Sequence, residues 1–366
     1  MNLFVKFFWV GIVFSSTAIG GVKAQSCQCD KVFARVKQNV ENNYAGWFDK
    51  VNFDNVKKYH SYSEPFKMAT KGIGNDNDCA AKINEWLSYF YDKNLKVTSS
   101  LNNQKLVGQA PNQGLVSNET MNSAQAPKLE FEDDLAIVTL PVMGSNTAKM
   151  LSMLMDKEKG SLEDAGYWII DLRNTKGSND QVLDILLPYI YTRPMVKYHS
   201  EIRMTQQNYD LWYDTYAKSA YASLKPEDKR QKEIELDSMK AHFGRGYNPM
   251  GKVADTLVFD KVAAKPKKVA VLINAGTEQA AELFTNLAKQ SDKVTIMGEN
   301  SGGNIDYDLL VEPPTYCPQI TFQMPIQRRL WLDAGYFMDK VGIKPDVALS
   351  GKNWIDEAYM SLKKGK

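Results

Sequence analysis

The segment KVAVLINAGTEQAAELF, residues 268–284, decides the fold class. Its apolar run predicts a buried strand, its Gly-Thr pair predicts a turn, and the residues after the turn predict the start of a helix. A strand–turn–helix elbow raises one side chain above the end of a sheet, where a nucleophile can meet a substrate. In this chain that side chain is Gln279. A carboxamide forms hydrogen bonds but does not attack a carbonyl carbon, because acyl transfer requires a hydroxyl or a thiol.

The alternation of strands and helices extends on both sides of this segment. Residues 128–142 predict a hairpin, and apolar strands linked by helices follow it. Strands are predicted at 167–172, 268–274, 293–297, 307–312 and 319–324, and helices at 146–158, 180–191, 279–290 and 353–363. Uninterrupted apolar strands indicate a sheet that is covered on both faces, so the predicted fold class is α/β.

Three further segments accompany this core. Residues 25–98 place apolar side chains at helical spacing and predict an N-terminal helical domain. Residues 99–127 are polar, with Pro and Gly, and predict a linker or surface loop. The core occupies 128–366, and its aromatic and charged segment 195–258 predicts a helical insertion.

The first 24 residues have the pattern of a cleaved signal peptide. A lysine precedes an apolar run, and Val22 and Ala24 are small residues at the positions that a signal peptidase reads. Serine, threonine and glycine interrupt the run, which makes it too short and too polar for a stable membrane span. We therefore expect export to a periplasmic, extracellular or cell-surface location.

The charge balance and the motifs limit the classes of partner. The chain has 45 basic and 43 acidic residues, a formal net charge of +2. Nucleic-acid binding requires a clustered basic face, which this balance does not indicate. No motif for a metal ion or an organic cofactor is present in the sequence, so none is expected. A peptide or protein segment, or a small apolar ligand, is the expected partner.

The four cysteines are candidates for disulfides, because export exposes them to an oxidising compartment. They are Cys27, Cys29, Cys79 and Cys317. The one-residue spacing of the first two, with no histidine or acid cluster nearby, does not match a metal site. A disulfide from this pair to Cys79 is the favoured interpretation. Lipid modification of Cys27 is less favoured, because the preceding KAQS lacks the leucine usual in such signals.

Four segments in order resemble the tail-specific or C-terminal-processing peptidases, the S41 serine peptidase family. They are YWIIDLRNTKGSNDQV (167–182), KVAVLINAGTEQAAELF (268–284), KVTIMGENSGG (293–303) and VGIKPDVAL (341–349). Residues 41–51 and 87–97 also resemble the helical module of the branch related to tricorn protease and interphotoreceptor retinoid-binding protein. The resemblance implies a ClpP/crotonase-like core with the active site beside the helical module. It favours the branch without a PDZ domain, because 99–127 is too short for one.

The chain departs from the family pattern at the position of the nucleophile. Aligned on Thr277, Ala280 and Glu282, the resemblance places the family's serine at Gln279. The turn that helps to form the oxyanion hole retains one glycine of the usual pair. By the resemblance, this oxyanion turn is formed by Gly177, Ser178 and Ala280.

The positions of the catalytic base are also changed. One branch of the family takes a lysine from the position of Asn304, and the other takes a histidine from the position of Asn94. Neither amide binds a proton near neutral pH. Asp339 is expected at the position of the acid that orients the base. Ser301, in a glycine-rich turn without a recognisable base, is the candidate for a substitute nucleophile.

Other residues near these motifs have structural explanations. Asp171 and Arg173 are expected to form a buried ion pair at the end of their strand. Thr277 is expected to cap the following helix, and Glu282 to form a local hydrogen bond. Ligand contacts in the groove are expected from Thr277, Gln279, Gly302 and Gly303.

Two functions follow from this pattern. The first is an exported S41 homologue that no longer hydrolyses peptides and that binds an extended peptide or an apolar ligand in the former active-site groove. Such binding requires main-chain hydrogen bonds and no nucleophile. The second is an active serine-type endopeptidase that uses a non-standard nucleophile and base.

Overall fold

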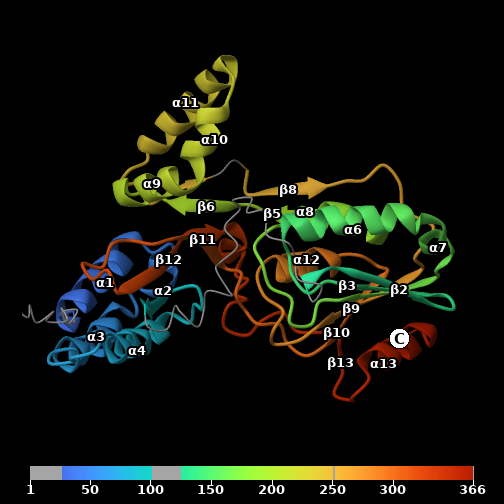
Figure 1. Cartoon of the computed structure of the whole chain (residues 1–366), viewed down its shortest axis with the longest axis horizontal. Helices are drawn as coiled ribbons and strands as arrows, with labels where there is room; N and C mark the ends of the chain where they lie inside the picture. Colours follow the sequence, from blue (N-terminus) through green and yellow to red (C-terminus); the bar gives the residue numbers. More distant parts are fainter. Residues whose placement is uncertain (1–26, 101–124, 250–251, 366) are drawn as a thin grey trace, which may run out of the picture.

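The main sheet has six strands and carries the elbow. The structure is a computed structural model that describes residues 27–100, 125–249 and 252–365 (Figure 1). The predicted signal peptide and most of the predicted linker lie outside these residues. The strands lie in the order β13 (Val347–Ala348), β10 (Val294–Gly298), β9 (Lys268–Ile273), β4 (Tyr167–Asp171), β3 (Leu135–Thr139) and β2 (Lys128–Glu132). β2 and β3 form the antiparallel hairpin predicted for this segment, and the other neighbours are parallel.

Helices cover both faces of this sheet, which confirms the α/β fold class. Helices α6 (Ser145–Lys157), α8 (Gln181–Ile190) and α12 (Ala280–Ala288) lie on one face, and α13 (Trp354–Lys363) lies on the other (Figure 1). Alternate residues of β4 enter the two cores. Trp168 and Ile170 are in the larger core, and Ile169 is in the smaller core beneath α13. Because both faces are buried, the strand is apolar throughout its length. The short α7 (Lys159–Asp164) follows α6.

A second sheet joins the N-terminal helices to the core. Its long strand β12 (Ile320–Arg329) pairs with β11 (Tyr307–Val311), β1 (Lys96–Ser99) and β6 (Ser200–Arg203), and β7 (Tyr247–Pro249) pairs with β6. The helices before β1 are α1 (Cys29–Asn43), α2 (Trp47–Lys50), α3 (Val56–Ala69), α4 (Asp76–Leu87) and the 3₁₀ turn η1 (Ser88–Phe90). The predicted helical domain therefore ends in a strand of a sheet that it shares with the core.

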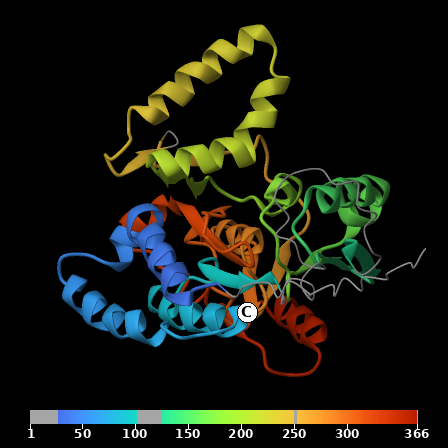
Figure 2. The same cartoon turned by 60° about the vertical axis from the view of Figure 1, so that its left-hand side comes forward.

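The helical prediction for 195–258 is right for its middle and wrong for its ends. The middle contains α9 (Gln206–Trp212), the π-helical turn η3 (Tyr213–Ala217), α10 (Lys218–Ser223) and α11 (Pro226–Lys240). The ends are strands: β5 (Met195–Tyr198) pairs with β8 (Ala254–Leu257), and β6 pairs with β7. These pairs join residues about fifty positions apart, so no local periodicity reveals them. α10 and α11 project away from both sheets (Figures 1 and 2).

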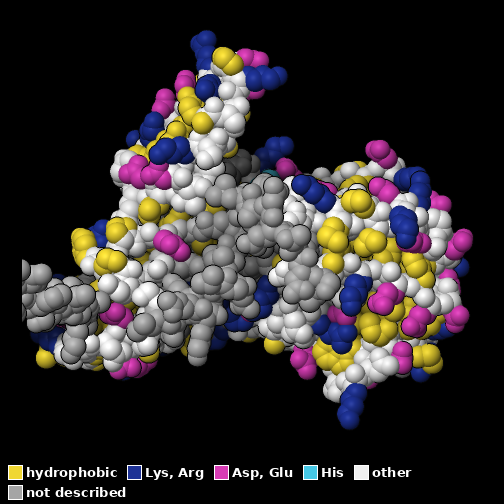
Figure 3. Space-filling view, in the orientation of Figure 1, with side chains coloured by type: hydrophobic (Ala, Val, Ile, Leu, Met, Phe, Trp, Pro, Cys, Tyr) yellow, Lys and Arg dark blue, Asp and Glu magenta, His cyan; other side chains and the backbone are white. Residues whose placement is uncertain are grey.

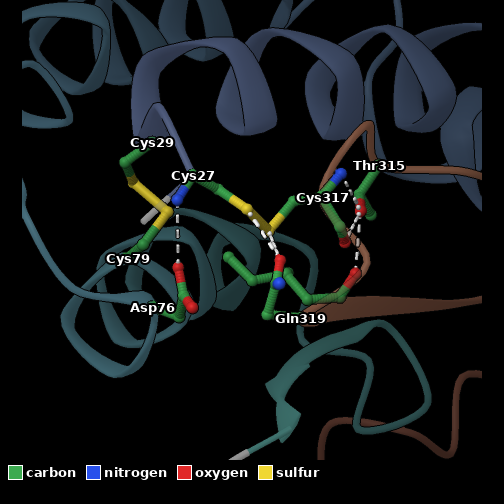
Figure 4. Close-up of a disulfide and its surroundings, with 8 residues drawn as sticks. Cys27, Cys29, Asp76, Cys79, Thr315, Cys317 and Gln319 are labelled. Carbon is green, nitrogen blue, oxygen red and sulfur yellow. Dashed lines mark hydrogen bonds between the residues drawn. A yellow bond between two sulfur atoms is a disulfide. The ribbon is translucent and has the colours of Figure 1, made fainter. Parts of the chain in front are cut away.

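Two disulfides fasten the N-terminal segment (Figure 4). Cys29 is bonded to Cys79, which joins α1 to α4, and Cys27 is bonded to Cys317, in the loop before β12. The backbone N–H of Cys27 also donates to Asp76 Oδ1 at 3.4 Å. Because Cys27 and Cys317 are joined in a disulfide, their sulfurs are not thiolate ligands for a metal ion. Among the described helices, none has the length and apolar character that a membrane span requires.

Candidate functional site: an elbow that carries glutamine

The elbow, residues 274–280, connects β9 to α12 in a strained conformation. Gln279 has φ 59° and ψ −120°, a region that non-glycine residues rarely adopt. Thr277 fixes the turn: its hydroxyl donates to the carbonyl of Leu172 at 2.7 Å and accepts from the N–H of Asn274 at 3.0 Å. The prediction that Thr277 caps α12 is therefore wrong. Gln279 is the N-cap residue, and its N–H donates to Glu282 Oε2 at 3.1 Å.

The side chain of Gln279 occupies the oxyanion turn. Its Oε1 accepts a hydrogen bond from the backbone N–H of Gly177 at 3.2 Å. The N–H of Ala280 donates to the carbonyl of Gly177 at 3.0 Å. Two of the N–H groups that the resemblance assigns to the oxyanion hole thus have partners within the protein, and Ser178 follows in the same turn. Glycine is required at 177, because a Cβ there would lie 2.2 Å from the carbonyl oxygen of Met143.

Both positions expected for a base are buried amides. Asn94 Nδ2 donates to the backbone carbonyl of Tyr307 at 2.9 Å, and the backbone carbonyl of Asn94 accepts from Gln323 Nε2 at 3.2 Å. The backbone N–H of Asn304 donates to Glu282 Oε2 at 2.9 Å. Among the described residues, Oδ1 of Asn304 has no hydrogen-bond partner. Neither side chain can take a proton from a nucleophile at neutral pH.

Glu282 organises the surroundings of the elbow. Besides the N–H groups of Gln279 and Asn304, its carboxylate accepts from the hydroxyl of Ser301 at 2.6 Å and from the N–H of Gly303 at 2.8 Å. Burial raises the pKa of Glu282, while these hydrogen bonds act in the opposite direction. The contacts reach well beyond the local bond expected from the sequence. Ser301 is 5% exposed, and its oxygen also accepts from the N–H of Ile343 at 2.6 Å.

Asp339 belongs to a buried group of acids beside the elbow. Its Oδ1 accepts from the N–H groups of Ile305 and Asp306, each at 2.7 Å, and Asp306 Oδ2 accepts from the N–H of Asp339 at 2.9 Å. Burial, together with the charges of Asp92 and Asp306, raises the pKa of Asp339 well above its usual value. Burial also raises the pKa of Asp92 to about 6, although the hydroxyl of Tyr44 donates to it at 2.8 Å. Sequence reasoning missed this group, because its members come from three separate segments.

The predicted ion pair lies at the end of β4, next to the elbow. Nε of Arg173 donates to Asp171 Oδ1 at 2.8 Å, and the guanidinium lies 5.5 Å from the ring centroid of Trp354. Arg173 therefore bonds to Asp171 and lies against Trp354, the first residue of α13. This ion pair marks the end of β4, and the contacts that hold the elbow are those of the residues described above.

The model of peptidase family S41 matches residues 134–349, more than half of the chain. This chain belongs to peptidase family S41. That membership confirms the resemblance drawn from the four sequence segments, and the matched range includes the elbow and the oxyanion turn.

Solved structures share the fold of this S41 chain at low sequence identity. A protein from Parabacteroides merdae, crystallised as a candidate peptidase, is 14% identical with a TM-score of 0.57, over 92% of this chain and 97% of that one. Mature CPAF is 12% identical with a TM-score of 0.52, over 88% and 93%. A search of curated proteins finds no match. These likenesses support the fold alone.

Proposed function

We propose that this chain is an exported S41-family protein that binds an extended peptide segment, or an apolar ligand, without cleaving it. The observation that carries the proposal is the hydrogen bond from the N–H of Gly177 to Oε1 of Gln279. It places a carboxamide where the family's serine is expected and uses a donor that would otherwise face a substrate oxyanion. Export is supported by the leader-like first 24 residues and by the two disulfides.

The strain at Gln279 supports a retained binding function. A non-glycine residue at positive φ costs about 1–3 kcal/mol and persists where the surrounding structure fixes it, most often at functional sites. Here Glu282 and Thr277 fix the elbow, although no hydroxyl stands at its apex. Binding a peptide through main-chain hydrogen bonds requires a fixed backbone geometry and does not require a nucleophile.

One contact favours the alternative of an active serine peptidase. The hydroxyl of Ser301 lies 2.6 Å from a Glu282 carboxylate oxygen, a distance suited to a nucleophile and its base. The carboxylate, however, already accepts three backbone N–H groups, and Ser301 is almost fully buried. Such a serine is poorly placed to reach a peptide carbonyl.

Labelling with a fluorophosphonate probe separates the two functions. The purified chain is incubated with the probe beside an active S41 peptidase as the positive control, and adducts are located by mass spectrometry. We expect the control to be labelled and this chain to remain unmodified. An adduct on Ser301, or on any other serine, would establish the peptidase alternative instead.

A further inference from the structure

Glu278, the residue directly before Gln279, is bound by two lysines from different loops. Lys93 Nζ lies 3.2 Å from Glu278 Oε1, and Lys176 Nζ lies 3.3 Å from Oε2. Lys93 also donates to the carbonyl of Gly302 at 2.5 Å. The glutamate side chain is 13% exposed, whereas the lysine side chains are 50% and 61% exposed. The pair Lys93 and Lys176, called here the lysine pair, thus presents two ammonium groups to solvent at the elbow.

The position of Glu278 depends on a glycine. A Cβ at Gly302 would lie 2.4 Å from Glu278 Cγ and 3.0 Å from its Oε1, so only glycine leaves room for the carboxylate. The result is a shaped site that holds one carboxylate between two cations. Its charge is not fully neutralised, because two positive groups face one negative group. Ion pairs with such exposed lysines contribute only about 0–1 kcal/mol each, so another carboxylate can displace Glu278.

The two chain segments next to the lysine pair, around residues 91 and 337–341, carry exposed apolar side chains. Tyr91, Phe337 and Val341 are 59%, 57% and 58% exposed. Tyr91 precedes Lys93 by two residues, and Lys340 Nζ lies 4.9 Å from the Tyr91 ring centroid. The carbonyl of Val341 accepts from Asn300 Nδ2 at 2.9 Å, close to Gly302 in the chain. Exposed apolar groups rimmed by charge are typical of binding surfaces.

We infer that the lysine pair is a carboxylate-binding site, which Glu278 fills in the free protein and which a glutamate or aspartate of a partner segment fills on binding. The partner is an extended protein segment in which acidic residues alternate with apolar ones. Its carboxylate contacts Lys93 and Lys176, and its apolar side chains contact Tyr91, Phe337 and Val341. This inference rests on the proposed peptide-binding function and specifies the chemistry of the ligand.

Peptide binding tests the site directly. The probes are fluorescein-labelled peptides of about ten residues, with amidated C-termini, in which leucine and phenylalanine alternate with glutamate, with glutamine or with lysine. Binding to the full mature chain is followed by fluorescence anisotropy at low and high salt. We expect the glutamate peptide to bind roughly tenfold more tightly than the glutamine peptide, and this advantage to shrink at high salt.

Variants assign the effect to individual groups. Lys93→Met with Lys176→Met should remove the preference for the glutamate peptide. Glu278→Gln should tighten its binding by roughly three- to tenfold, because the internal competitor is lost. Lys159→Met is the matched control, because this lysine side chain on α7 is 70% exposed, and it should leave the affinity for each peptide unchanged. Circular dichroism verifies that each variant is folded.

The outcomes separate this inference from the proposed function. Weaker binding of the glutamate peptide to Glu278→Gln, or a preference for the lysine peptide, overturns the carboxylate site while peptide binding stands. A further glutamine peptide with a free C-terminus is the comparison probe, and if it binds as tightly as the amidated glutamate peptide, the assignment to side-chain carboxylates is overturned. If no peptide binds, the inference fails, while binding of an apolar ligand is left standing. If a bound peptide is cleaved, the proposed function fails whichever peptide is preferred.

Discussion

The elbow and the projecting insertion are built in opposite ways. At the elbow, Glu282 is fully buried and bonds to its own turn and to residues 301–304. In α11, the ion pairs join residues three positions apart, and only Leu236 and Met239 are buried. Basic and acidic side chains lie together over this projecting part (Figure 3). One region is fixed by contacts between distant segments, and the other by contacts within α11 and with the neighbouring α9 and α10.

Contacts between distant segments hold the elbow in its strained geometry with glutamine at position 279. The Glu282 carboxylate and the Thr277 hydroxyl hold the turn, and the side chain of Gln279 joins it to the N–H of Gly177. Two of the groups that hold the strained backbone, Glu282 and Thr277, therefore lie outside position 279.

Glu282→Ala should produce the largest loss of stability. It leaves three N–H groups, two of them buried, and the hydroxyl of Ser301 without their acceptor, and we expect a cost of about 3–5 kcal/mol in the free energy of unfolding. Urea denaturation measures it. Glu235→Ala in α11 is the matched control, since that side chain is 50% exposed, and it should change stability by less than about 0.5 kcal/mol. Equal losses of stability in the two variants would show that the Glu282 contacts hold the fold no more strongly than a surface ion pair does.

The buried acids should make stability depend on pH. Burial raises the pKa of Asp92 from its usual value to about 6, so between about pH 4 and pH 6 the folded state binds more protons than the unfolded state. The contribution of Asp92 to stability therefore falls as the pH rises through this window. Asp92→Asn removes the titrating group. The free energy of unfolding of the variant minus that of the unchanged chain should therefore rise by about 2–3 kcal/mol between pH 4 and pH 8. A constant difference across this range would contradict the prediction.

Helix α11 should tolerate change at its outer face. Ile234 is 57% exposed, whereas Leu236 is 6% exposed. Ile234→Ala should alter the unfolding free energy by less than about 0.5 kcal/mol. Leu236→Ala should act locally and speed proteolytic cleavage of α10 and α11, while the urea midpoint of the whole chain changes little. A large shift of that midpoint would show that the insertion is coupled to the core.

The sequence predicted the fold where the signal was local or came from family motifs. The apolar runs of β4 and β9, the hairpin at 128–142 and the placement of Gln279 at the apex of the elbow all follow from adjacent residues. The strands at both ends of the insertion could not be predicted from adjacent residues, because β6 and β7 become strands only through pairing in the second sheet.

The contacts of the candidate site were predictable only in part. The positions of Asn94, Asn304 and Asp339 came from motifs, but their hydrogen bonds come from segments tens to hundreds of residues away. The contact of Lys93 and Lys176 with Glu278 has no signal in the sequence, since surface lysines are common and the shared carboxylate emerges only after folding.

Binding and cleavage measured in one sample distinguish a peptide-binding protein from a peptidase. The mature chain is titrated with the glutamate-containing peptide by calorimetry, and the contents of the cell are then analysed by mass spectrometry. The account predicts saturable binding with every peptide molecule intact after prolonged incubation. Peptide fragments produced by this chain, and absent from a sample without it, would contradict the account.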